Sequence, residues 1–88
     1  MIGVEEAAKR AVEYMKGFFP DASAIRLEEV EITDDKQFWY ITLSIVESES
    51  EPNVLFPAMQ FKKVKSYKIF KIFAENGEVL SMKIRELK

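Results

Sequence analysis

The sequence predicts an α+β fold: one N-terminal helix packed across a four-stranded antiparallel β-sheet, in the order α-β-β-β-β. Apolar residues over 4–19 recur with the 3.6-residue period of an amphipathic helix. The segments that follow are rich in β-branched and aromatic residues, and an Asn76-Gly77 pair between the last two is a strong hairpin signal. With 88 residues, the chain is expected to form one α+β domain over 1–88.

The helix is expected to cover residues 4–19 and to lie on the sheet with one apolar stripe. Gly3 is an acceptable N-cap, Glu6 favours the helix N-terminus, and Pro20 prevents continuation. The stripe consists of Val4, Ala8, Ala11, Val12, Met15, Phe18 and Phe19.

The first two strands are expected over 25–32 and 38–46. Apolar alternation slips in the first strand, and an extra residue at Glu28-Glu29 would return its apolar side chains to one face, which predicts a β-bulge there. In the second strand the core face is predicted to hold Trp39, Ile41, Leu43 and Ile45. Phe38 and Tyr40 then lie on the outer face.

The third strand is expected over 61–73, and the turn after it decides how the last strand faces. A two-residue Asn-Gly turn would pair Phe73 with Leu80. A three-residue loop closed by Gly77 would instead pair Ile72 with Leu80 and Phe70 with Met82. We favour the second register because it buries one apolar set together: Phe70, Ile72, Leu80, Met82 and Ile84.

The simplest topology is a meander with the helix across its concave face, and this layout resembles the PepSY and cystatin-like group of small domains. At residue level the resemblance is carried by Tyr67-Lys-Ile-Phe70 leading into Glu75-Asn-Gly-Glu-Val-Leu80. It implies a fold in which a helix packs across a bent antiparallel sheet. The glutamine-centred loop of cystatin protease inhibitors is missing, so no inhibitory activity is inferred from it.

Composition removes several classes of chemistry. The chain has no cysteine and no histidine, which excludes disulfides, thiolate catalysis and the usual general base. The alternating Glu47, Glu49 and Glu51 lack the spacing of a calcium loop, and no phosphate-binding glycine motif occurs. We therefore expect no enzyme activity, no cofactor and no metal. Without an export signal or an apolar run of membrane length, a cytoplasmic location is expected.

Charge is distributed unevenly along the chain. Residues 1–57 carry 5 Lys/Arg and 12 Asp/Glu, whereas residues 58–88 carry 8 and 3. Such a split marks either a partner-binding surface or strands that neutralise each other within one sheet. The basic residues of the last two strands are interleaved with aromatic and apolar ones, a pattern that single-stranded nucleic-acid binders use. The basic residues are Lys62, Lys63, Lys65, Lys68, Lys71, Lys83, Arg85 and Lys88, and their neighbours are Phe61, Tyr67, Ile69 and Phe73. Nucleic-acid binding is therefore one alternative function.

The other feature is apolar and lies on the expected outer face of the sheet. It comprises Phe38, Tyr40, Ile69 and Phe73, with Val54, Leu55 and Phe56 near the end of the sheet. Either the long 47–57 connection covers this set, or the set is open and contacts another protein. Our first hypothesis is a non-enzymatic protein-interaction module, as a homodimer or an accessory, regulatory or inhibitory subunit. A small-ligand pocket between helix and sheet, beside Ala8 and Ala11, is a third possibility.

Overall fold

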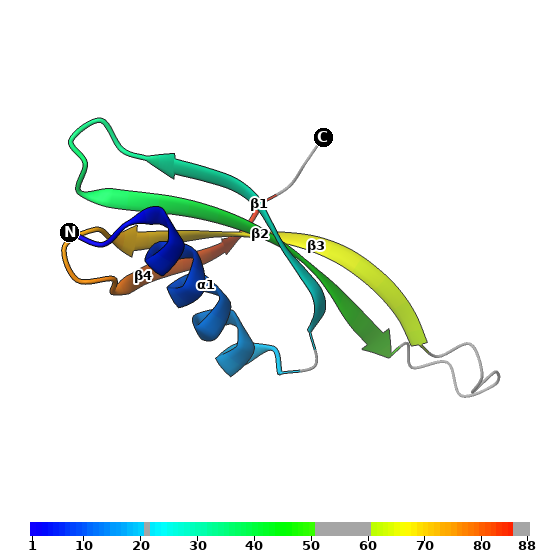
Figure 1. Cartoon of the computed structure of the whole chain (residues 1–88). Helices are drawn as coiled ribbons and strands as arrows, with labels where there is room; N and C mark the ends of the chain where they lie inside the picture. The colour runs from blue at the N-terminus through cyan, green and yellow to red at the C-terminus, as the bar shows by residue number, and fades with distance from the viewer. Residues whose placement is uncertain (21, 51–60, 86–88) are drawn as a thin grey trace.

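The structure is a computed structural model that describes residues 1–20, 22–50 and 61–85, without the side chains of 47–50 and 61–64. Helix α1 (Val4–Phe18) is followed by strands β1 (Ser23–Ile32), β2 (Phe38–Ser50), β3 (Phe61–Phe73) and β4 (Val79–Ile84) (Figure 1). All neighbouring strands are antiparallel, in the order β1-β2-β3-β4. The predicted α+β fold, one helix and then a four-stranded antiparallel sheet, is confirmed.

Helix α1 packs on the sheet through its smallest side chains. It begins after Gly3, whose backbone is extended and whose carbonyl accepts a hydrogen bond from the Ala7 N–H. Ala7, Ala11 and Met15 are fully buried, so the buried stripe has an i,i+4 spacing. The predicted stripe was therefore partly wrong, because Val4 and Phe18 are 38% and 61% exposed. The two alanines let the helix backbone approach the sheet closely.

The bulge predicted in β1 is confirmed. Leu27 pairs with Leu43 and Glu29 pairs with Thr42, so Glu28 is the extra residue of β1. The insertion returns Val30 to the face that carries Leu27, the face on which α1 packs. We call this face the helix face and the opposite one the outer face. The bulge also places Glu29 on the outer face.

The β3–β4 hairpin differs from the prediction in its loop and in one pairing. Phe73 and Glu78 are joined by a backbone hydrogen bond of 2.8 Å, which leaves residues 74–77 as the loop instead of three residues. Ile72 consequently pairs with Val79, and Leu80 is an extra residue in β4. The second irregularity restores the predicted pairing of Phe70 with Met82. The longer loop shifts the register of β4 by one residue, and the bulge at Leu80 shifts it back.

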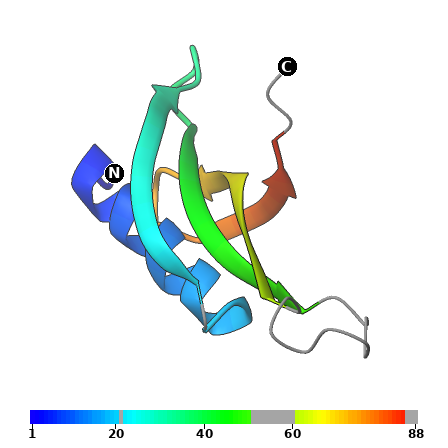
Figure 2. The ribbon, with the colours of Figure 1, turned by 90° about the vertical axis from the view of Figure 1, so that its right-hand side faces the viewer.

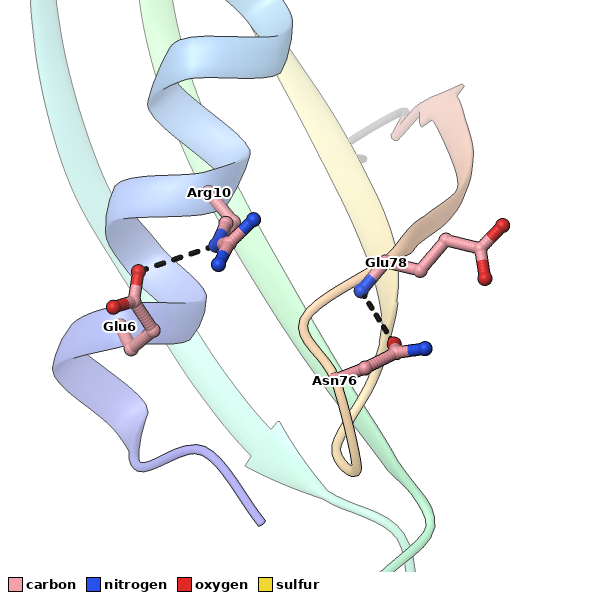
Figure 3. Close-up of polar contacts among 4 residues, drawn as sticks. All are labelled: Glu6, Arg10, Asn76 and Glu78. Atoms are coloured by element: carbon pink, nitrogen blue, oxygen red, sulfur yellow. Dashed lines mark hydrogen bonds and ion pairs between the residues drawn. The ribbon is translucent and has the colours of Figure 1, made fainter.

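Two short-range polar contacts lie in the N-terminal half of α1 and in the hairpin loop (Figure 3). The Asn76 side-chain oxygen accepts a hydrogen bond of 2.9 Å from the Glu78 N–H, while Gly77 adopts a left-handed backbone with φ of 79°. On the helix, Arg10 Nε lies 3.2 Å from Glu6 Oε2. Asn-Gly is needed here because the asparagine oxygen closes the loop and glycine accepts the positive φ.

The hydrophobic core lies between α1 and the middle of the helix face. It joins the buried helix residues to Ile41, Leu43, Ile45, Phe70 and Ile72. The predicted core face of β2 is confirmed, with Trp39 packed at its margin. Leu80 and Ile84 were wrongly predicted as core residues, since they are 45% and 70% exposed. Figure 2 shows the reason for Ile84: the C-terminal end of β4 turns away from α1.

Candidate functional site

The outer face is the broadest surface on which the predicted binding residues meet. Among the described residues α1 is the sole helix, and it lies on the opposite side of the sheet (Figure 2). Successive side chains of a strand alternate between faces, so the register assigns every second residue of β2 and β3 to this surface. Those with described side chains are Phe38, Tyr40, Thr42, Ser44, Val46, Lys65, Tyr67, Ile69, Lys71 and Phe73.

The apolar part of the outer face is a row of aromatic and aliphatic side chains. Phe38 and Phe73 are cross-strand partners whose rings stack with centroids 5.7 Å apart. Lys71 Nζ lies 4.3 Å from the centroid of the Phe38 ring, within the range of a cation–π contact. Tyr40 and Ile69 continue the row and, like the phenylalanines, are half-buried. The structure thus brings together the four outer apolar residues that the sequence predicted.

Small polar residues form the floor of the outer face between the large side chains. Thr42 and Ser44 are only 2% and 1% exposed, although no helix or strand among the described residues covers them. Ser44 donates a hydrogen bond of 3.2 Å to Glu28 Oε2. A short side chain flanked by larger neighbours is shielded by them, and its hydroxyl must then find a partner within the surface.

Arg85 joins the two edge strands across this floor. It follows β4 and its backbone N–H donates to the Tyr67 carbonyl oxygen at 2.9 Å. Its guanidinium pairs with the Glu29 carboxylate on β1 and donates a hydrogen bond of 3.3 Å to Thr42 Oγ1. Sequence reasoning missed this contact, since only the register shows that residues 29 and 85 lie near one another. The ion pair is part of the outer surface.

Beside this ion pair the outer face is hollowed. A depression of about 300 Å³ is lined by Glu29, Glu31, Tyr40, Thr42, Ile69 and Arg85. Carboxylates stand on its β1 side, the guanidinium stands on its β4 side, and apolar side chains of β2 and β3 lie between them. Ligand pockets usually bury most of a small molecule. This open hollow with a charged rim suits a protruding side chain of a partner better.

The predicted lysine set does not form one surface. Lys65 is exposed on the outer face, with Nζ 5.4 Å from the centroid of the Tyr67 ring. Lys68 lies on the helix face, is only 7% exposed, and has Nζ 5.0 Å from the centroid of the Phe19 ring. The side chain of Lys63 and the whole of Val54, Leu55 and Phe56 lie outside the described residues. The basic-aromatic pattern is therefore divided between two faces.

Asp35, in the turn before β2, accepts two local hydrogen bonds. The Thr33 hydroxyl donates a hydrogen bond of 2.6 Å to Asp35 Oδ1, and the Gln37 N–H donates to the same oxygen at 3.0 Å. These hydrogen bonds stabilise the ionised form and lower the pKa of Asp35 from its ordinary value of 3.8. One oxygen of this carboxylate closes the turn, which is a structural task.

Neither a cluster of metal ligands nor a membrane-spanning helix is found in the described part of the chain. There, no three acidic, histidine or cysteine side chains gather in a way that could hold a metal ion. Within the same residues, α1 lacks the length and apolarity needed to cross a membrane.

Comparison with known proteins adds no relative. The chain matches no protein-family model, no curated protein and no solved structure. The structure shows a small α+β fold of one helix and a four-stranded antiparallel sheet, and no relative confirms the expected resemblance to the PepSY and cystatin-like group.

Proposed function

We propose that this chain is a small non-enzymatic protein-binding module and that the outer face of its sheet is the contact surface. One observation carries the proposal: the aromatic row of the outer face lies on the side of the sheet opposite α1. The second face of an antiparallel sheet is ordinarily polar when water covers it. Here two stacked phenylalanines, a tyrosine and an isoleucine occupy it. Surface aromatics are enriched in protein interfaces.

The charges around the aromatic row support the same function. Lysines and arginine border the β3 and β4 side of the outer face, while glutamates border its β1 side. Charged rims of this kind orient partners and speed their association. Because the chain has no cysteine, the module is suited to a reducing compartment, and we propose that it acts in the cytoplasm.

Nucleic-acid binding is the weaker alternative, because the outer face carries Glu28, Glu29 and Glu31 beside its cations and lacks Lys68. A strand of nucleic acid is held by phosphate contacts beside stacking platforms on one surface. Lys68 is buried under Phe19 on the helix face and has no access to such a surface. The small-ligand alternative has less support: Ala11 packs within the core cluster, and the hollow between α1 and the hairpin is lined by Arg10, Glu13, Tyr14, Gly77, Glu78 and Val79 and does not include it.

The proposal is tested by the mass of the complex purified at low salt from the cells that express the chain. Native mass spectrometry of the wild type should show added protein mass. Phe73→Asp places a charge in the stacked phenylalanine pair of the aromatic row and should remove that mass, while Lys9→Asp, on the exposed side of α1, should retain it. Far-ultraviolet circular dichroism establishes that both variants are folded.

Two results would overturn the proposal. One is a bare wild-type chain. The other is added mass that is nuclease-sensitive, survives Phe73→Asp and is lost in Lys65→Glu, which would assign the outer face to nucleic acid.

A further inference from the structure

We infer that the partner of the outer face is a second copy of this chain, stacked sheet on sheet about a two-fold axis parallel to the strands. The inference rests on the proposed function and specifies its partner. It is carried by the way in which the charges of the outer face are segregated between the two edges of the sheet, which makes the surface complementary to itself in one orientation.

The segregation follows from the strand register. On β1 the outer face holds one arginine and three glutamates, Arg26, Glu28, Glu29 and Glu31. Among the side chains that the structure describes, β3 and β4 contribute four cations to it, Lys65, Lys71, Lys83 and Arg85, and β2 contributes no charge. One edge of this surface is therefore acidic and the other is basic, with the aromatic row between them.

Two symmetric orientations are open to a pair of stacked sheets. A two-fold axis perpendicular to the strands places β1 over β1 of the partner subunit, so that acidic edges face each other and basic edges face each other. An axis parallel to the strands exchanges the edges and places the acidic β1 over the basic β4 of the partner subunit. Since isologous contacts must be self-complementary, the charges select the parallel axis.

The register also predicts the contacts of this orientation. Glu29 lies in the same cross-strand row as Thr42, Ile69 and Lys83, so it faces Lys83 of the partner subunit. In the next row, which holds Tyr40 and Lys71, the tyrosine faces the partner's Lys71, a cation–π pairing. Stacked sheets lie about 10 Å apart, a gap that facing lysine and glutamate side chains can bridge.

One contact in this orientation is between like charges. Arg26 and Arg85 share a row with Ser44 and Tyr67, so Arg26 faces Arg85 of the partner subunit. Arg85 is already paired with Glu29 within its own chain, which offsets much of the repulsion. The favourable contacts of the other rows outnumber this one.

A reciprocal charge reversal tests the orientation. Glu31 and Lys83 are both exposed and lie on opposite edges, two residue pairs apart in register and therefore in adjacent rows of the outer face. Neither Glu31→Lys nor Lys83→Glu disturbs the Glu29–Arg85 pair. Dimer dissociation constants are measured by sedimentation equilibrium at low salt for the wild type, for each variant and for their equimolar mixture. Lys9→Glu, on the exposed side of α1, is the matched control.

The parallel axis predicts a distinctive set of results. The wild type dimerises, each variant alone dimerises about tenfold more weakly, and the mixture forms a heterodimer of about wild-type affinity. The control leaves the dissociation constant unchanged, and salt weakens the wild-type dimer because the pairs lie at the rim. A dimer that neither single variant weakens contradicts this orientation.

The same experiment separates this inference from the function on which it rests. A wild-type chain that stays monomeric at all concentrations overturns the self-association inference. If the chain from its own cells then still carries a different protein, which Phe73→Asp releases, the outer face remains a protein-binding surface. If no protein is bound in either experiment, both conclusions fail.

Discussion

Gly77 is expected to be the most sensitive glycine of the chain, and replacing it with alanine tests the hairpin loop. Its φ of 79° lies in the left-handed region, where an L-residue with a β-carbon costs about 1–2 kcal/mol. A β-carbon at this position would lie 3.2 Å from Arg10 Nε and 3.4 Å from Ile2 Cδ1. Both atoms belong to flexible side chains that can shift by a few tenths of an ångström, so they add little. Gly77→Ala should therefore lower the free energy of unfolding by about 1–2 kcal/mol.

Gly17 supplies the matched control within the same chain. It lies in α1, and no neighbouring atom would be within 4 Å of an added β-carbon. Alanine is favoured over glycine inside a helix by about 0.8–1 kcal/mol, with somewhat less expected near the helix end. Gly17→Ala should consequently stabilise the protein, while the chemically identical change at Gly77 destabilises it.

Urea unfolding followed by fluorescence measures both changes, since Trp39 is the chain's one tryptophan and packs against the core. In thermal melts the Gly77→Ala variant should lose about 4–8 °C for each kcal/mol. Gly77→Asn should be less harmful than Gly77→Ala, because asparagine enters the left-handed region more readily. A neutral or stabilising Gly77→Ala would refute the left-handed loop.

Three further changes test other parts of the structure. Lys68→Glu should destabilise the fold by about 1–3 kcal/mol, because it places a carboxylate under an aromatic ring at a buried position, whereas Lys65→Glu should be nearly neutral; equal melting temperatures would contradict their opposite facing. Phe70→Ala should cost about 3–5 kcal/mol in urea unfolding and Leu80→Ala far less, since Phe70 is fully buried and Leu80 is 45% exposed. Asp35→Asn should lower stability at pH 7, because the native-state pKa of Asp35 is lowered, chiefly by the threonine hydroxyl two residues before it. A carboxylate with a lowered pKa stabilises the fold above its unfolded pKa of about 3.9 and loses that contribution as the pH falls through its folded pKa. The two melting curves should therefore converge in acid, and a difference independent of pH would exclude this role.

The sequence contained enough information for the order of the elements and for the bulge in β1. The bulge was readable because Leu27 and Val30 break the alternation of apolar residues, and only an extra residue returns them to one face. The face on which Lys68 lies can also be predicted from the sequence. Once Phe70 and Ile72 are assigned to the core, the two-residue period of a strand places Lys68 on the helix face and Lys65 on the outer face.

The remaining features depend on contacts between distant segments. In the β3–β4 hairpin, the four-residue loop shifts the register by one residue and the extra residue Leu80 shifts it back. The pairing of Phe70 with Met82 was therefore predicted correctly although the predicted loop was wrong. The exposure of Ile84 follows from the turning of β4 away from α1, which no local pattern encodes (Figure 2). The contact between Arg85 and Glu29 likewise requires the whole sheet.

The outer face as a protein-contact surface is tested most directly by photo-crosslinking at Tyr40 in the cells that express the chain. Replacing Tyr40 with the photoreactive aromatic benzoylphenylalanine keeps a ring beside the hollow on the outer face, and the same replacement at Lys9 is the control. We predict a protein adduct from position 40 and none from position 9. The self-association inference further predicts that the adduct has twice the mass of the chain. Equal crosslinking from both positions, or no adduct from position 40, would contradict the assignment of the outer face.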